Sequence, residues 1–74
     1  MAKRDRVIDI SFLGKNLRKH REAQNLSMQD LANIAEIEKS QIARIETGES
    51  DPRLSTIMTI ASALQISVEE LLVR

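Results

Sequence analysis

The stretch "EKSQIARIETG", residues 38–48, has two unlike faces when it is placed on a helix. Successive residues turn by about 100° on a helix, so positions three and four apart share a face. One stripe carries two hydroxyls, a methyl and a guanidinium, from Ser40, Ala43, Arg44 and Thr47. The opposite stripe carries Ile42, Ile45 and Glu46. The apolar stripe predicts attachment to a core, and the polar stripe predicts hydrogen bonds to a partner.

The composition predicts one all-α domain. Among 74 residues there are one aromatic side chain (Phe12), two Gly and one Pro, which leaves an aliphatic core and too few turn residues for a sheet protein. With no Cys and a single His (His20), we expect no disulfide, no metal site and no cofactor. We expect no catalytic residues, because no phosphate loop and no nucleophile with a base is present. The chain lacks a signal peptide and a long apolar run, which favours a cytoplasmic protein without membrane contact.

Charge is unevenly distributed along a chain whose formal net charge is zero. Residues 1–25 carry seven Lys or Arg against three acids, whereas residues 26–53 carry three against six. A basic end suits a polyanionic partner, but a solvated charged helix gives the same count.

Apolar spacing and caps divide the chain into five short helices. Ser27 with Asp30, and Ser67 with Glu70, have capping-box spacing, and Gly48 suits a left-handed helix end. The expected helices cover about residues 9 or 11 to 24, 28–35, 38–48, 54–64 and 68–72. We therefore predict a folded domain over residues 11–74, preceded by an N-terminal arm over residues 1–10. The basic arm is expected either to reach along DNA or to be solvated without order.

Four motifs in order carry a family resemblance over residues 13–72. These are "LR..RE" in the first helix, "LS..DLA" in the second, "IARIETGES.P" across the third, and "IA.AL.IS..ELL" beyond it. The chain thus resembles the lambda-repressor and Cro-like (XRE-type) DNA-binding family. The resemblance implies a compact five-helix domain that binds double-stranded DNA, with a helix-turn-helix formed by the second and third helices.

In this family the third helix enters the major groove, whose base edges require compact hydrogen-bonding groups near the start of the helix. The candidate base-reading residues are Lys39, Ser40, Gln41 and Arg44. Ser40 and Gln41 are expected to accept as well as donate, and Arg44 is the best candidate for a bidentate contact to guanine. Ordinary surface residues on a bundle are the alternative interpretation.

Phosphate contacts are expected to flank this helix, at the start of the second helix and after the end of the third. The candidates are Ser27, Met28, Gln29, Thr47 and Gly48. Many relatives carry Gln at the position of Met28, so one side-chain donor is absent here. Lys39 is an alternative phosphate contact.

Two charged residues, Arg21 and Glu46, fall on predicted inward faces. Buried charges are costly unless they are paired. The family pattern implies that they pair with each other, as a structural tie between the first and third helices. Glu36 occupies a turn position where relatives usually have Gly, which would place strain on its backbone.

Apolar residues crowd the C-terminal end, where Leu71, Leu72 and Val73 cannot all face one core. We predict a homodimer whose interface includes Met58, Ile66, Leu72 and Val73, bound to an inverted-repeat site. No sensor domain follows residue 74, so no small-molecule ligand is expected. The alternative function is a protein-interaction module, or an antitoxin-like partner, that keeps the fold with weak or no specific DNA binding.

Overall fold

The computed structural model describes residues 9–74 and places five α-helices and no strands within them. The helices are α1 (Ser11–Ala23), α2 (Met28–Ala35), α3 (Lys39–Thr47), α4 (Leu54–Leu64) and α5 (Val68–Leu72). The all-α prediction is therefore confirmed, with bounds within about two residues of those expected. Most of the predicted N-terminal arm, residues 1–8, lies outside the described residues.

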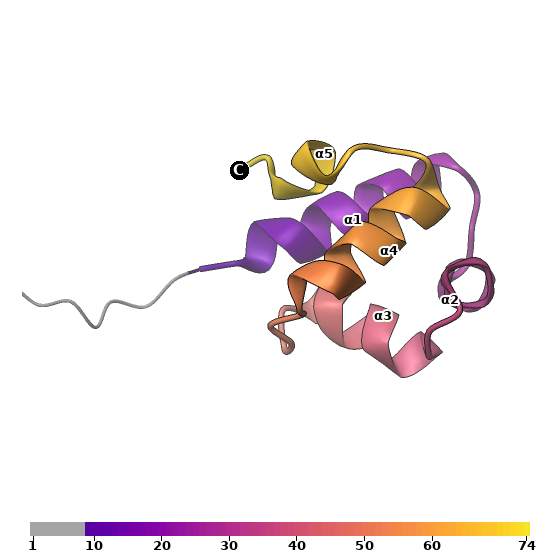
Figure 1. Cartoon of the computed structure of the whole chain (residues 1–74). Helices are drawn as coiled ribbons and strands as arrows, with labels where there is room; N and C mark the ends of the chain where they lie inside the picture. The colour runs from indigo at the N-terminus through magenta and orange to yellow at the C-terminus, as the bar shows by residue number, and fades with distance from the viewer. Residues whose placement is uncertain (1–8) are drawn as a thin grey trace, which may run out of the picture.

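Helix α1 lies between α3 on one side and α5 on the other, and α4 packs against α2 and α5 (Figure 1). The core that these helices enclose is aliphatic, as composition predicted. Its buried members are Leu13, Leu17, Leu31, Ala32, Ile42, Ile45, Ile60, Ala61, Leu64 and Leu71. The one aromatic ring, Phe12, lies at the edge and faces the Arg74 guanidinium, 5.7 Å from the ring centroid. None of the helices in residues 9–74 is long and apolar enough to cross a bilayer.

Side-chain amides from α1 and from its C-cap residue, Gln24, bind carbonyls at the ends of the last two helices. Asn16 Nδ2 donates to the carbonyls of Leu71 and Val73 at 2.9 and 2.6 Å, and Gln24 Nε2 donates to the Leu64 carbonyl at 2.7 Å. Terminal carbonyls have no partner inside their own helix, so these bonds satisfy groups that would otherwise need water. Helix α1 therefore holds α4 and α5 through polar contacts as well as through the core.

Four residues in the turns of the described part of the chain adopt the left-handed conformation. Gly48 ends α3 with φ 83°, as predicted, and Glu36 ends α2 with φ 59°. Asn25 and Gln65 adopt the same conformation, which the sequence pattern did not predict. A non-glycine residue in this region costs on the order of 1 kcal/mol. The three-residue connection between α2 and α3 therefore depends on a strained backbone at Glu36, held by the packing on either side.

Both predicted capping boxes are present. The one at α2 should make the stability of the fold depend on pH in the acid range. The Asp30 carboxylate accepts the Ser27 amide at 2.9 Å, and this backbone hydrogen bond lowers the pKa of Asp30 below its ordinary value of 3.8. A carboxyl group whose pKa is lower in the folded state stabilises the fold above its unfolded pKa and loses that effect as the pH falls through its folded pKa.

We expect Asp30→Asn to be less stable than the parent at neutral pH. The difference in the free energy of unfolding should be constant well above pH 3.8 and should disappear as the pH falls through the lower folded pKa of Asp30. Urea unfolding of both proteins at a series of acid pH values measures this difference in the free energy of unfolding. A difference that stays constant through the acid range would mean that the ionised carboxylate does not stabilise α2.

Candidate nucleic-acid interface

Helix α3 is fixed by its inner stripe. Ile42 is fully buried and Ile45 is 3% exposed, and both belong to the aliphatic core. The opposite stripe contains exposed Ser40, Arg44 and Thr47. The two faces seen in the sequence are therefore two faces in space, one packed and one open to solvent.

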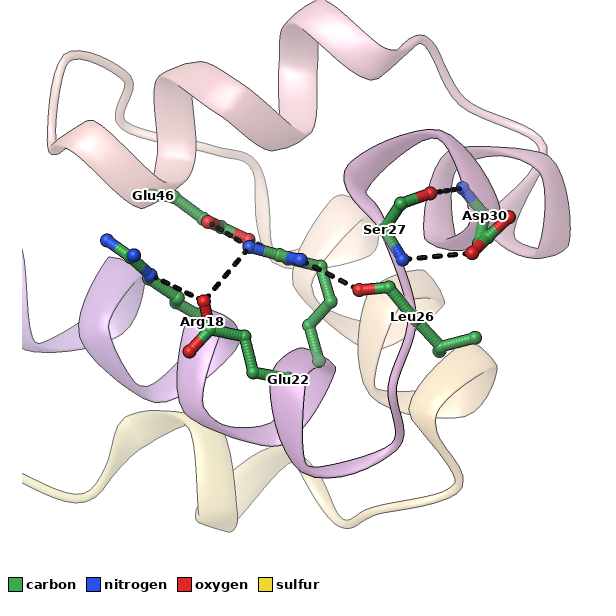
Figure 2. Close-up of polar contacts among 7 residues, drawn as sticks. Arg18, Glu22, Leu26, Ser27, Asp30 and Glu46 are labelled. Carbon is green, nitrogen blue, oxygen red and sulfur yellow. Dashed lines mark hydrogen bonds and ion pairs between the residues drawn. The ribbon is translucent and has the colours of Figure 1, made fainter.

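An ion pair ties the end of α3 to α1 (Figure 2). Arg21 Nε and Nη2 donate to the two carboxylate oxygens of Glu46 at 2.7 and 3.1 Å, a bidentate arrangement. Arg21 Nη1 also donates to the Leu26 carbonyl at 2.7 Å. The Arg21 and Glu46 side chains are only 10% and 3% exposed, and the hydrogen bond to Glu46 raises the pKa of Arg21 above its ordinary value. Within residues 9–74, no buried side-chain nitrogen or oxygen lacks a partner, so this buried pair is fully hydrogen-bonded.

The side chains of Lys39, Ser40 and Arg44 are exposed and make no hydrogen bond or ion pair within the described part of the chain. Their donors are therefore available to a partner that lies along α3. Ala43 is half-buried between them, where its small side chain keeps the helix surface flat. This surface presents the groups that major-groove base edges bind.

Gln41 differs from the other base-reading candidates because it caps α3. Its Oε1 accepts the Glu38 amide at 3.1 Å, and the residue is half-buried. We expected Gln41 to offer both an acceptor and a donor, but the cap occupies its oxygen and leaves the amide nitrogen. Gln41 also borders a hollow beside α3, which it shares with Arg44 and with Arg53 from the start of α4. Arg53 was not among the predicted residues, because neither periodicity nor a motif distinguishes it.

At the start of α2, the capping box limits which groups can meet a phosphate. The Ser27 amide donates to Asp30, and the Ser27 hydroxyl accepts from the Asp30 amide. Met28 is half-buried against the core, so its side chain takes no part. The backbone amides of Met28 and Gln29 are free to donate here, as are the Ser27 hydroxyl hydrogen and the second hydrogen of Gln29 Nε2, whose first is donated to Asn33.

At the end of α3, the predicted phosphate contacts are exposed but internally bonded. The Thr47 hydroxyl donates to the Arg44 carbonyl at 3.2 Å, and the Gly48 amide donates to the Ile45 carbonyl at 3.1 Å. A phosphate contact from Thr47 therefore requires its hydroxyl to rotate away from this carbonyl.

The arrangement, a short helix and a tight turn before an outward-facing second helix, is matched by sequence comparison. The helix-turn-helix family profile matches residues 17–71, which is most of the chain. The chain belongs to the helix-turn-helix family.

Two relatives of this helix-turn-helix chain are controller proteins by name. The chain is 39% identical over 63 residues to control protein C.SmaI of Serratia marcescens, a match that covers 85% of this chain and 75% of the relative. The crystal structure of the restriction-modification controller protein C.AhdI from Aeromonas hydrophila superimposes with a TM-score of 0.82 at 33% identity, over 85% of this chain and 96% of that one. A third relative, the transcriptional regulator DdrOP3 of Deinococcus deserti, is 33% identical, and the match covers 46% of its length.

Three of the four residues predicted for a dimer interface are exposed on the helix-turn-helix domain. Met58, Leu72 and Val73 are 54%, 41% and 61% exposed, whereas Ile66 is half-buried and packs against the core. Two further large apolar side chains, Ile34 and Leu54, are 53% and 62% exposed. Neither residue was among those predicted for an interface.

Proposed function

We propose that this chain is a small transcriptional regulator that binds double-stranded DNA by inserting α3 into the major groove. One observation carries the proposal. Helix α3 is fixed from behind by a buried bidentate ion pair, while its outer stripe presents Arg44 and Ser40, with Lys39 beside it. None of these three side chains has a partner within residues 9–74. A rigid helix with free donors on one face is what direct reading of base edges requires.

We further propose that two copies act together on an inverted repeat. A domain of this size offers few base contacts, so a second copy would supply the remaining specificity. The exposed apolar residues Leu72 and Val73 at the end of α5 suit a symmetric contact, in which each residue appears twice. Two reading helices would then lie about 34 Å apart, one duplex turn.

The names of the relatives support the controller type of regulator. C.SmaI is named a control protein, and C.AhdI is named a restriction-modification controller. We infer that this chain has a comparable role in regulating genes, either as a repressor or as a controller, and we expect it to work where DNA is found, in the cytoplasm.

Binding to DNA at a series of salt concentrations tests the proposal. The probes are a duplex selected by the protein from a random library and a random duplex of equal length. The logarithm of the association constant for both should fall linearly with the logarithm of salt concentration, because Lys and Arg release counterions from phosphates. The selected duplex should stay at least about a thousandfold tighter at physiological salt. Equal affinity for the two duplexes would refute sequence-specific regulation.

A protein-interaction module is the second candidate, and the charge of the interface favours it. Glu36, Glu38 and Glu49 are exposed around α3, and the Asp30 carboxylate lies at the start of α2, where a phosphate would approach. Acids at these positions weaken attraction to the duplex. Binding too weak to measure on any duplex, even at low salt, would favour this candidate.

The Leu72→Lys substitution tests the proposed dimer. A charge at this 41% exposed position should cost little in a monomer, but it would appear twice at a symmetric apolar contact. We expect a smaller dimer population in sedimentation and weaker binding to an inverted repeat, with an unchanged melting temperature at low protein concentration. The matched control is Ala23→Lys, which adds the same charge at an exposed position at the end of α1, outside α5. If Leu72→Lys dimerises like the parent, the contact lies elsewhere, with Met58 as the next residue to test.

A further inference from the structure

Helix α1 comes close to the backbone of α3 at Gly14, a buried residue that no motif assigned to the interface. A Cβ built on Gly14 would clash with the Ile45 carbonyl oxygen and would lie 2.7 Å from the Glu46 carbonyl oxygen. It would also lie 2.9 Å from the Glu46 carbonyl carbon. All three neighbours are backbone atoms, so a side chain at this position can be accommodated only if the backbones of α1 and α3 move apart.

Gly14 and Arg21 are two turns apart and lie on the same face of α1. They hold the same part of α3 in two ways. Gly14 sets how closely the backbones approach, and Arg21 fixes the Glu46 side chain at 2.7 Å. Helix α3 is therefore positioned by a steric stop at one point and by a bidentate ion pair at the other.

The carbonyl that meets Gly14 also belongs to the cap of α3. The Ile45 oxygen accepts the Gly48 amide at 3.1 Å, which forms part of the left-handed end of the helix. Displacing this oxygen would disturb the cap and, with it, the exposed Thr47 and Arg44 on the outer stripe. The spacing at Gly14 is thus linked through the backbone to the surface that we propose reads DNA.

We propose that Gly14 is a positioning residue that sets the placement of α3 against α1, and hence the register of the reading surface relative to the start of α2. The consequence for DNA rests on the proposed function, whereas the placement of α3 does not. Because the clash involves backbone, truncating the Ile45 or Glu46 side chain should not relieve it.

The test is Gly14→Ala in the full chain, compared with Ile60→Val as a control that loosens the core from α4. In ¹⁵N–¹H spectra of the folded proteins without DNA, Gly14→Ala should shift the amide signals of residues 39–48 as a group. Ile60→Val should not shift them as a group. If Gly14→Ala is unfolded in buffer, trimethylamine N-oxide, which favours compact states, is added to all samples.

The second readout is DNA affinity at a temperature where the proteins are fully folded. The ratio of affinity for a library-selected duplex to that for a random duplex should fall at least about tenfold in Gly14→Ala, because the base contacts move out of register. It should be unchanged in Ile60→Val. If the parent itself shows no preference for the selected duplex, the proposed function fails, and the amide shifts still decide whether Gly14 positions α3.

Two results would overturn the inference. In the first, folded Gly14→Ala has the parent's α3 signals, and any DNA preference of the parent is retained. In the second, the variant stays unfolded even with the osmolyte, so that Gly14 serves folding alone.

Discussion

Glu46→Ala should destabilise the fold by about 3–5 kcal/mol, the largest effect that we expect from a single side-chain truncation at the interface. The substitution leaves the Arg21 guanidinium, 10% exposed, without the carboxylate that binds it at two points. Arg21 keeps its hydrogen bond to the Leu26 carbonyl and a longer ion pair, 3.9 Å, with Glu22. The Glu22 carboxylate is 53% exposed and is already paired with Arg18, so it compensates the buried charge only in part. Urea unfolding at low temperature measures the loss, because little stability will remain in a domain of this size.

Two comparisons separate pairing from simple loss of packing. Arg21→Ala should be similarly costly, and the double variant should cost clearly less than the two single losses together, because it leaves neither charge unpaired. Glu46→Gln keeps the shape and an acceptor for Arg21, so it isolates the contribution of the charge. Additive losses in Arg21→Ala and Glu46→Ala would show that the two residues contribute independently, contrary to the geometry.

Arg44→Ala should weaken specific DNA binding by about 1–3 kcal/mol in each half-site and relax the base preference at one position. Its guanidinium is exposed and has no partner within the described residues, so folding stability should change little. Titration with the selected duplex, with single-base variants of it and with a random duplex measures both the loss and its sequence dependence.

The matched control for this prediction is Arg44→Lys, which keeps the charge but loses the planar pair of donors. If Arg44 binds guanine in a bidentate manner, Lys should restore binding to random DNA but not the base preference. An equal loss on selected and random duplexes in Arg44→Ala would instead make Arg44 a phosphate contact.

The fold was largely predictable because local and global signals agree in this chain. The Ser27 and Ser67 boxes start α2 and α5, Gly48 ends α3, and the spacing of Ile42 and Ile45 marks a buried stripe. Each of these features depends on residues a few positions apart, which a sequence displays directly. The resemblance added the connection between helices, which periodicity alone does not provide.

The interface was less predictable because its details depend on contacts between distant elements or on competing hydrogen bonds. The spacing of Gln41 from Glu38 is that of a capping box, yet the pattern did not show whether its amide would read bases or cap α3. Gly14 approaches the α3 backbone at Ile45, which is 31 positions away in the chain, so no local pattern reveals this contact. Ile66 is half-buried and packs against the core, a placement that depends on the tertiary fold and not on neighbouring residues in the sequence.

The most direct test of α3 as the reading element is a guanine methylation-interference footprint on the duplex selected by the parent. Methylation at guanine N7 blocks the major-groove edge. We expect interference in two short windows on the same face of the duplex, with centres about 10 base pairs apart, and we expect the innermost contact in each to be lost in Arg44→Ala. No interference at guanine N7 in the half-sites, or an unchanged pattern in Arg44→Ala, would contradict major-groove reading by α3.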